Sequence, residues 1–218
     1  MPRLYAVGDI HGCLTHLARL VEKVPFDPED TIVFIGDYID RGEDSKGTVE
    51  FLLRFRDEHP GSIFLRGNHE DMFEDYLFQQ NRYQREVYLM NGGAETLRAY
   101  GLDPWCPICP QDFPSDHLGF LRNTEFMYQQ DGFLFVHAGL RSDLALEDQD
   151  RMALLWIRQE FFEREHPFGV TVVFGHTPLR DIFKNLPFAI GIDTGAVFGG
   201  QLTCVELADG DIQVVYQT

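Results

Sequence analysis

The chain has 218 residues and a hydrophobic content of 44%, which is typical of a globular protein. Its formal net charge of −17 at pH 7 argues against a nucleic-acid partner, because phosphate backbones attract basic surfaces. No apolar run approaches the roughly 18 residues of a membrane-spanning helix, and the N-terminal residues do not show the pattern of a secretory signal. We therefore expect a cytoplasmic protein without membrane contact, formed by a single domain over residues 1–218 and monomeric by default.

The first third of the chain alternates between strand and helix patterns. Apolar runs at 3–7, 31–35 and 62–65 are typical of buried strands. Between them, residues 14–24 and 46–59 carry apolar side chains at helical spacing. This βαβαβ order predicts parallel strands joined by crossover helices.

The remainder of the chain predicts a helical segment and then a second series of strands. Residues 71–122 are polar and interrupted by Gly and Pro, so we expect a helical excursion over the sheet that shapes access to a site. The later elements are expected as strands at 125–130, 133–136 and 170–174, a helix at about 150–165, and short strands over 188–216 with a hairpin turn at Asp209-Gly210.

Cys106 and Cys109 form a lone CxxC pattern inside the proline-rich part of the excursion. Such a pair is found in half of a zinc site, in a redox pair, or in a loop by coincidence. No second CxxC completes a zinc set, so a coincidence is favoured, and the role of the pair stays open.

Five of the expected strands are followed by the same kind of residue. The segments are GDIHG at 8–12, GDYIDRG at 36–42, RGNHE at 66–70, HAG at 137–139 and GH at 175–176. Ligands of an open α/β sheet bind beyond the carboxyl ends of its strands. A single Asp or His there is more often a turn or structural residue. Five recurrences, however, predict a metal site with oxygen and nitrogen ligands, which suits Mn, Fe, Zn or Mg.

In this order, the five motifs resemble those of the phosphoprotein phosphatase family of metallophosphoesterases, and the short chain is similar to its compact bacterial and phage branch. The resemblance covers residues 8–176. It implies an α/β fold of the calcineurin-like type, with a central β-sandwich of mixed sheets flanked by helices. It also implies a metal-dependent serine/threonine protein phosphatase that hydrolyses phosphomonoesters by direct attack of a metal-bridging hydroxide.

The same resemblance implies two divalent metal ions per chain, with Mn expected in assays and Fe or Zn as alternatives. The implied ligands are Asp9 and His11 for the first ion, Asp37 for both ions, and Asn68, His137 and His176 for the second. Two such ions can hold both ends of an in-line displacement and acidify a water.

The remaining implied residues act on the leaving group and the phosphate. His69, oriented by Asp40, would protonate the leaving oxygen. Arg41, Arg66 and Arg158 would bind the phosphoryl group, which the planar guanidinium fork matches.

Three functions stay open at this point. A phosphorylated protein is the favoured substrate. A symmetrical hydrolase of dinucleoside polyphosphates (diadenosine tetraphosphate) or of another small phosphoester is the alternative, since that sister branch shares the GDIHGC start at 8–13. That branch usually has a longer insertion before the last His motif. A metal-stabilised binding module without catalysis is disfavoured, because the ligands and the His69/Asp40 pair are all present.

Overall fold

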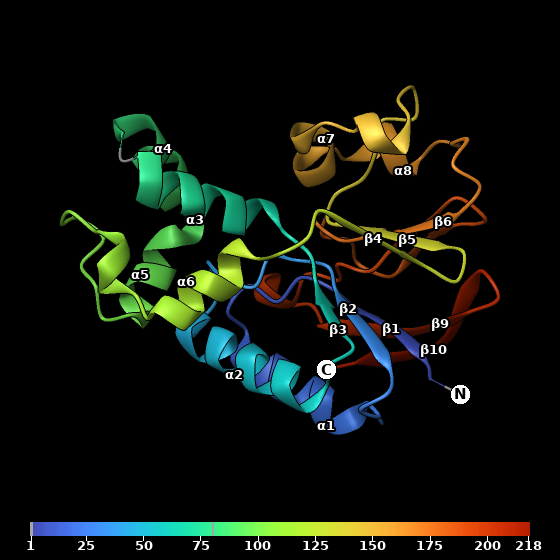
Figure 1. Ribbon diagram of the computed structural model, residues 1–218, viewed down its shortest axis with the longest axis horizontal. Coiled ribbons are helices and arrows are strands. Elements are labelled where there is room, and N and C mark those ends of the chain that lie inside the picture. The colour runs from blue at the N-terminus through green and yellow to red at the C-terminus, as the bar shows by residue number, and fades with distance from the viewer. Residues whose placement is uncertain (1, 80) are drawn as a thin grey trace.

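The computed structural model describes residues 2–79 and 81–218, and it forms two five-stranded sheets (Figure 1). The first sheet has the strand order β10-β9-β1-β2-β3. Its strands are β1 (Leu4–Val7), β2 (Thr31–Phe34), β3 (Ser62–Phe64), β9 (Thr203–Ala208) and β10 (Asp211–Gln217). The predicted parallel pairing of the first three strands is confirmed, while β9 and β10 run antiparallel.

The second sheet has the order β4-β5-β6-β8-β7. Its strands are β4 (Met127–Gln130), β5 (Phe133–Val136), β6 (Thr171–Phe174), β7 (Phe183–Asn185) and β8 (Ala189–Gly191). Parallel pairs join β5 to β6 and β6 to β8, and both edge strands are antiparallel. Both sheets are therefore mixed, as the family resemblance implied.

The two sheets pack face to face, and helices cover their outer faces (Figure 1). Successive residues of a strand point to opposite sides. In β2, Val33 lies in the core between the sheets, whereas Ile32 and Phe34 pack beneath α1 (Leu14–Lys23) and α2 (Ser45–Glu58). Burial on both faces explains why these strands are continuous apolar runs.

The predicted helical excursion is present and gathers at one end of the sandwich (Figure 1). It contains α3 (Asn68–Gln79), α4 (Arg82–Tyr88), a π-helical turn (Leu89–Gly93), α5 (Ala94–Ala99) and α6 (Ser115–Arg122). Its buried residues Tyr88, Leu97 and Phe120 belong to the same apolar cluster as α1 and α2. The excursion is thus packed into the core beside the carboxyl ends of the strands.

The single helix predicted at about 150–165 is wrong, because the segment forms α7 (Arg151–Trp156) and α8 (Gln159–Phe162). The backbone leaves the helical region at Ile157, with φ −61° and ψ 148°. The carbonyl of Leu154 would accept the next helical hydrogen bond, but it accepts from the N–H of Ala138 at 2.9 Å instead. A long-range contact therefore ends α7 just before Arg158.

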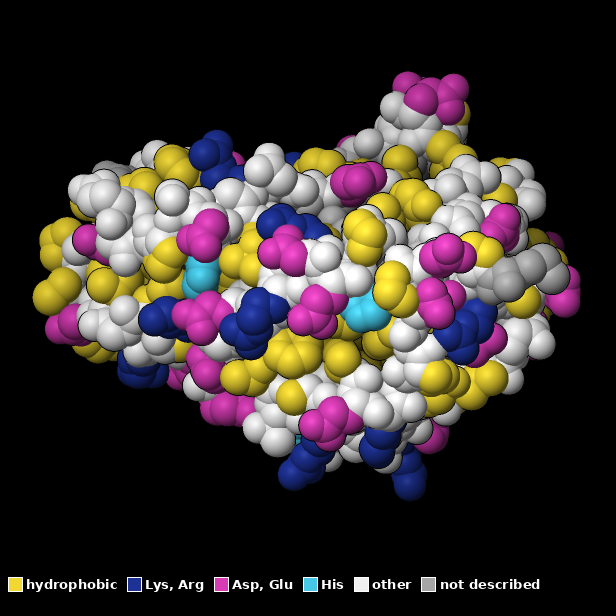
Figure 2. Space-filling view, turned by 60° about the horizontal axis from the view of Figure 1, so that its bottom comes forward, with side chains coloured by type: hydrophobic (Ala, Val, Ile, Leu, Met, Phe, Trp, Pro, Cys, Tyr) yellow, Lys and Arg dark blue, Asp and Glu magenta, His cyan; other side chains and the backbone are white. Residues whose placement is uncertain are grey.

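Acidic side chains are spread over the surface. Figure 2, which brings the bottom of the Figure 1 view forward, shows Asp and Glu lying among the Lys and Arg side chains of that face. Among the described residues, none of the helices is both long enough and apolar enough to cross a membrane.

Candidate functional site

The loops after β1, β2, β5 and β6, together with the start of α3, bring the predicted ligands to one place. Among the described residues, two groups of metal-ligating side chains have their ligand atoms within 4.8 Å of one another. The first group is His11, Asp37 and His69, and the second is Asp37, His137 and His176. Asp37 is shared by both groups, as a residue between two cations must be.

Asp37 lies at the centre of this cluster. Its Oδ2 is 3.4 Å from His11 Nε2, and its Oδ1 is 3.5 Å from His137 Nε2. Burial raises the pKa of this carboxyl, but the facing histidines, His137 first, lower it more, so the pKa is held far below its usual value. The direction of this shift favours the carboxylate form of Asp37 in a buried site.

The histidine tautomers leave the ligand atoms free of protons. His11 Nδ1 lies 3.0 Å from the carbonyl oxygen of Ile39, and His137 Nδ1 lies 3.0 Å from that of Ile35. A carbonyl only accepts, so both Nδ1 atoms carry the proton and both Nε2 atoms present a lone pair. Such an outer hydrogen bond is the usual way in which a metal-binding histidine is oriented. Burial also lowers the pKa of His11 to about 3, which keeps the ring neutral at pH 7.

Asn68 lies beside two histidines of the second group. Asn68 Oδ1 is 3.0 Å from His137 Nε2 and 2.8 Å from His176 Nδ1. Within the described part of the chain, His176 Nε2 is buried without a hydrogen-bond partner. The lone pair of His137 Nε2 faces the Asn68 oxygen, and His176 Nε2 lacks a donor, so these buried acceptors fit a cation. The residues present therefore suit the divalent ions that the motifs imply.

Asp9, like Asn68, is a predicted ligand that belongs to neither group. Its carboxylate accepts hydrogen bonds from the backbone N–H of His176 at 3.0 and 3.2 Å. The pKa of Asp9 is raised well above its usual value, first by burial and then by the charges of Asp193 and Asp37. A second cation beside Asp37 would relieve this repulsion.

His69 and Asp40 form the pair that the sequence predicts. His69 Nδ1 lies 2.7 Å from Asp40 Oδ2, and both side chains are fully buried. His69 Nε2, which lacks a hydrogen-bond partner among the described residues, points to Asp37 Oδ2 at 4.0 Å. Burial lowers the pKa of His69, but the charge of Asp37 and the bond to Asp40 outweigh it and raise that pKa.

Two of the three predicted phosphate-binding arginines lie at the rim of this cluster. Arg41 Nη1 is 2.7 Å from His11 Nε2. Arg158 Nη1 is 3.4 Å from the carbonyl oxygen of His176. The guanidinium of Arg66 donates to the carboxylates of Asp71, at 2.9 Å, and Glu74.

Other residues hold these loops in place. Glu70 Oε2 accepts from the N–H groups of Asp37 at 2.9 Å and Gly67 at 3.0 Å, and Oε1 accepts from that of Tyr38 at 2.9 Å. Glu70 thus ties the loop after β2 to the loop after β3. The RGNHE motif pointed to this residue, whereas no sequence signal marked Tyr88 and Thr96, whose hydroxyls reach Asp40.

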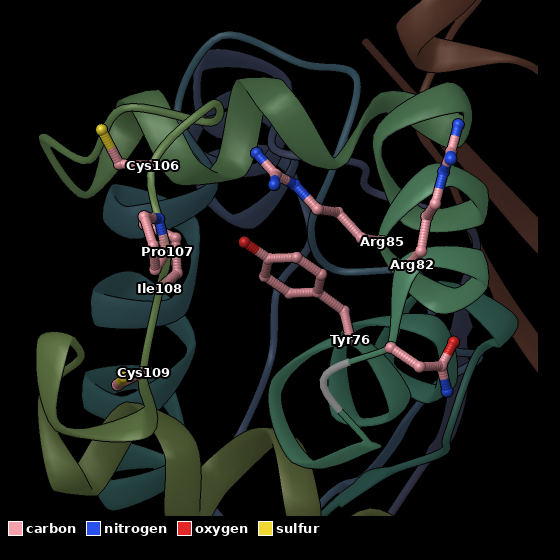
Figure 3. Close-up of a pocket in the computed structure, with 8 residues that line it drawn as sticks. Tyr76, Arg82, Arg85, Cys106, Pro107, Ile108 and Cys109 are labelled. Carbon is pink, nitrogen blue, oxygen red and sulfur yellow. The ribbon is translucent and has the colours of Figure 1, made fainter.

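Two cavities lie in this part of the molecule, one beside Arg41 and one within the excursion. An open groove of about 850 Å³ is lined by Arg41 together with His16, Arg98 and Val197. A smaller cavity of about 300 Å³ lies within the excursion, where Tyr76 and Arg85 face the Cys106–Cys109 stretch (Figure 3). All four cysteines are free thiols, and the metal-ligating groups described above do not include Cys106 or Cys109. Among the described residues that line the smaller cavity, there is no predicted metal ligand and no predicted phosphate-binding arginine.

The chain is similar to known proteins over nearly all of its length. The family model for calcineurin-like phosphoesterases matches residues 2–216. The chain is 32% identical to serine/threonine-protein phosphatase 1 of Salmonella typhimurium, over 94% of this chain and 91% of that protein. It is 28% identical to the asymmetrical bis(5'-nucleosyl)-tetraphosphatase PrpE of a Geobacillus strain, over 90% and 87% of the two chains.

Solved structures share the fold. A protein-tyrosine phosphatase of a Shewanella species superposes with a TM-score of 0.70 at 18% identity, covering 97% of this chain and 77% of that one. A serine/threonine phosphatase of Saccharomyces cerevisiae superposes with a TM-score of 0.67 at 17% identity, covering 99% and 79%. At these identities, the likeness concerns the fold alone.

Proposed function

The chain belongs to the calcineurin-like phosphoesterase family and is a metal-dependent phosphoesterase, and from this premise we propose that it removes phosphate from phosphoserine and phosphothreonine in proteins. One observation carries the proposal. Two buried groups of side chains share Asp37, and His69 of the first group pairs with Asp40. This arrangement suits a phosphoryl group held at the cations with a proton donor next to its ester oxygen.

The ligands of the proposed metal centre are Asp9, His11, Asp37, Asn68, His137 and His176. When bound, two divalent ions would neutralise the charge of the phosphate and lower the pKa of a bound water to about 7. We propose Mn in assays, with Fe or Zn as alternatives, because this donor set accepts all three.

His69 is proposed to donate the proton that an alkoxide leaving group needs. Its Nε2 faces the cluster, while Nδ1 donates to Asp40 Oδ2 at 2.7 Å, which fixes the ring. A general acid of this kind contributes about 10²–10⁴ in rate. Serine and threonine esters need such a donor, since their alkoxides are strongly basic.

Arg41 and Arg158 are proposed to bind the equatorial oxygens of the phosphoryl group from two sides of the cluster. For Arg66, the bonds to Asp71 and Glu74 favour a role at the start of α3, where it fixes the helix that begins at Asn68. The remainder of the substrate is proposed to lie in the groove that Arg41 lines.

The second candidate is hydrolysis of dinucleoside polyphosphates. The PrpE relative, named as a bis(5'-nucleosyl)-tetraphosphatase, supports it at 28% identity. The protein substrate is preferred because the serine/threonine-protein phosphatase relative is more similar, at 32% identity. The net charge of −17 also disfavours a polyanionic small molecule over a peptide that carries one phosphate.

We further propose a monomer in the cytoplasm. The four cysteines are free thiols, which suits a reducing compartment.

The proposed function predicts that the purified chain with Mn(II) hydrolyses p-nitrophenyl phosphate and that EDTA abolishes this turnover. A competition between a phosphoserine peptide and diadenosine tetraphosphate then ranks the two substrates, and we expect a higher kcat/KM for the peptide. Absence of turnover with every divalent ion tried would refute both candidates. A large preference for the dinucleotide would replace the first by the second.

A further inference from the structure

We propose that Tyr88, Gly92 and Thr96 of the excursion are positioning residues that hold Asp40 and Arg41 in place for hydrolysis. This inference rests on the proposed function, because it takes Asp40 to orient the proton donor and Arg41 to bind phosphate. The segment 88–96 contains the end of α4, the π-helical turn and the start of α5. It lies outside every motif at the strand ends.

The turn that these residues contact has an unusual backbone. Asp40 has a φ of 73° and Arg41 a φ of 69°. Two successive residues with a Cβ atom in the left-handed region are sterically unfavourable, because only glycine adopts it freely. Such a conformation persists only where the surrounding structure imposes it. Contacts from outside the turn must therefore stabilise it.

Thr96 and Tyr88 supply these contacts at Asp40. Asp40 Oδ1 accepts hydrogen bonds from Tyr88 Oη at 2.8 Å and from Thr96 Oγ1 at 2.6 Å. The backbone N–H of Asp40 donates to Thr96 Oγ1 at 2.9 Å and to Ser45 Oγ at 3.0 Å. Asp40 Oδ2 is then directed to His69 Nδ1. The carboxylate is bound at both oxygens, so its plane and the ring of His69 are fixed together.

Gly92 supplies the contact at Arg41. The backbone N–H of Arg41 donates to the carbonyl oxygen of Gly92 at 3.1 Å. Gly92 has a φ of 97°, and a Cβ atom there would lie 2.6 Å from Arg41 Cγ and 2.9 Å from Arg41 N. Only glycine allows this approach. The irregular turn at 89–93 thus has a physical reason, because it brings a carbonyl to the Arg41 backbone.

The interior of the excursion holds Tyr88 in turn. Its ring stacks on Tyr76 with centroids 4.8 Å apart and planes at 27°, and it packs on Phe73 at 5.7 Å. Tyr76 also forms a wall of the 300 Å³ cavity (Figure 3). Tyr88 is fully buried, so its hydroxyl has little freedom to leave Asp40.

These contacts separate into two effects on the reaction. Tyr88 and Thr96 act on His69 through Asp40, so they affect protonation of the leaving group. Gly92 acts on Arg41, so it affects binding of the phosphoryl group whatever the leaving group is. If the segment had only a structural role, substitutions in it would lower activity on substrates with good and poor leaving groups alike.

The test compares two substrates in steady-state kinetics with Mn(II). The p-nitrophenolate of p-nitrophenyl phosphate leaves without a proton, whereas the alkoxide of a phosphoserine peptide needs one. We expect Tyr88→Phe and Thr96→Val to lower kcat on the peptide by roughly tenfold or more, part of the 10²–10⁴ range of general acid catalysis. For Tyr88→Phe, which removes a bond to the carboxylate alone, the kcat on p-nitrophenyl phosphate should change by less than about twofold. Thr96→Ser, which keeps the hydroxyl, should restore activity on the peptide.

Gly92→Ala should instead lower kcat/KM on both substrates and weaken inhibition by inorganic phosphate. Tyr83→Phe is the matched control, because Tyr83 is 71% exposed on the same helix, α4, and it should behave as wild type on both substrates. Circular dichroism and metal content identify a variant that has lost its fold. Equal losses on both substrates for Tyr88→Phe in folded protein, or no loss on the peptide for either variant, would overturn the inference alone. A wild-type chain inactive on both substrates would overturn the proposed function with it.

Discussion

Removal of divalent metal should lower the thermal stability of this protein by a large amount. The structure gives the reason, because Asp9, Asp37 and Asp193 are buried close together, and their mutual repulsion contributes to the raised pKa of Asp9. Cations between these carboxylates would bind only the folded state, since the ligands come from loops that are far apart in the chain.

The magnitude follows from linkage. An ion present at 100 times its dissociation constant stabilises the folded state by about 2.7 kcal/mol per site. Two ligand groups give about 5 kcal/mol when the sites act independently. For a chain of 218 residues, each kcal/mol shifts Tm by about 2–4 °C, so saturation with Mn(II) should raise Tm by about 10–20 °C.

The assay is thermal unfolding of chelator-treated protein across a titration with Mn(II), with bound metal measured in parallel. Asp37→Asn removes the carboxylate that the two groups share, so it should abolish most of the shift. Asp30→Asn is the matched control, because Asp30 is an equally buried aspartate that pairs with Arg3 instead, and it should keep the full shift. A wild-type Tm that does not respond to Mn(II), or an Asp37→Asn variant that responds equally, would refute the reasoning.

Two further predictions concern single side chains. His69→Asn should lower turnover of alkyl phosphoesters by roughly 10²–10⁴ with nearly unchanged metal content; loss of metal would show that His69 is a ligand instead. Asp30→Asn should lower the free energy of unfolding by about 1–3 kcal/mol at pH 7, since the carboxylate accepts charge-assisted hydrogen bonds. Burial raises the pKa of Asp30, but the N–H groups of Arg3 and Asp27 and the Arg3 guanidinium lower it more, so this stability is present above the unfolded pKa of about 3.9 and is lost as pH falls through the lower folded pKa. Urea titrations at pH 7 and at about pH 3 check the sign, and an equal loss at both would contradict it.

The cluster of Asp, Asn and His side chains at the strand ends was predictable, because its chemistry and its topology are both local signals. Asp, Asn and His follow apolar strands, and parallel strands bring their carboxyl ends together. The break before Arg158 was not predictable in this way. It depends on whether the carbonyl of Leu154 is taken by Ala138, a contact between segments that the helical pattern of 150–165 does not contain.

Arg66 shows a different limit. Its motif predicts a phosphate-binding arginine, but Asp71 and Glu74 lie on the first two turns of the helix that follows, and both reach its guanidinium. Whether an arginine faces the site or a neighbouring carboxylate depends on side-chain geometry. Charge and spacing in the sequence allow both arrangements.

The residues that support the site were hardest to find, and the reason is chemical. Side chains that ligate or transfer protons belong to a few types, whereas those that hold them are ordinary, as Tyr88 and Thr96 are. These two lie 48 and 56 positions from Asp40. We expected the excursion only to shape access to the site. An excursion with that role alone could carry any polar side chains on the surface that faces the site. One that holds Asp40 must place hydroxyls within hydrogen-bond distance of a single carboxylate oxygen, so its interior is constrained by the reaction as much as by the core.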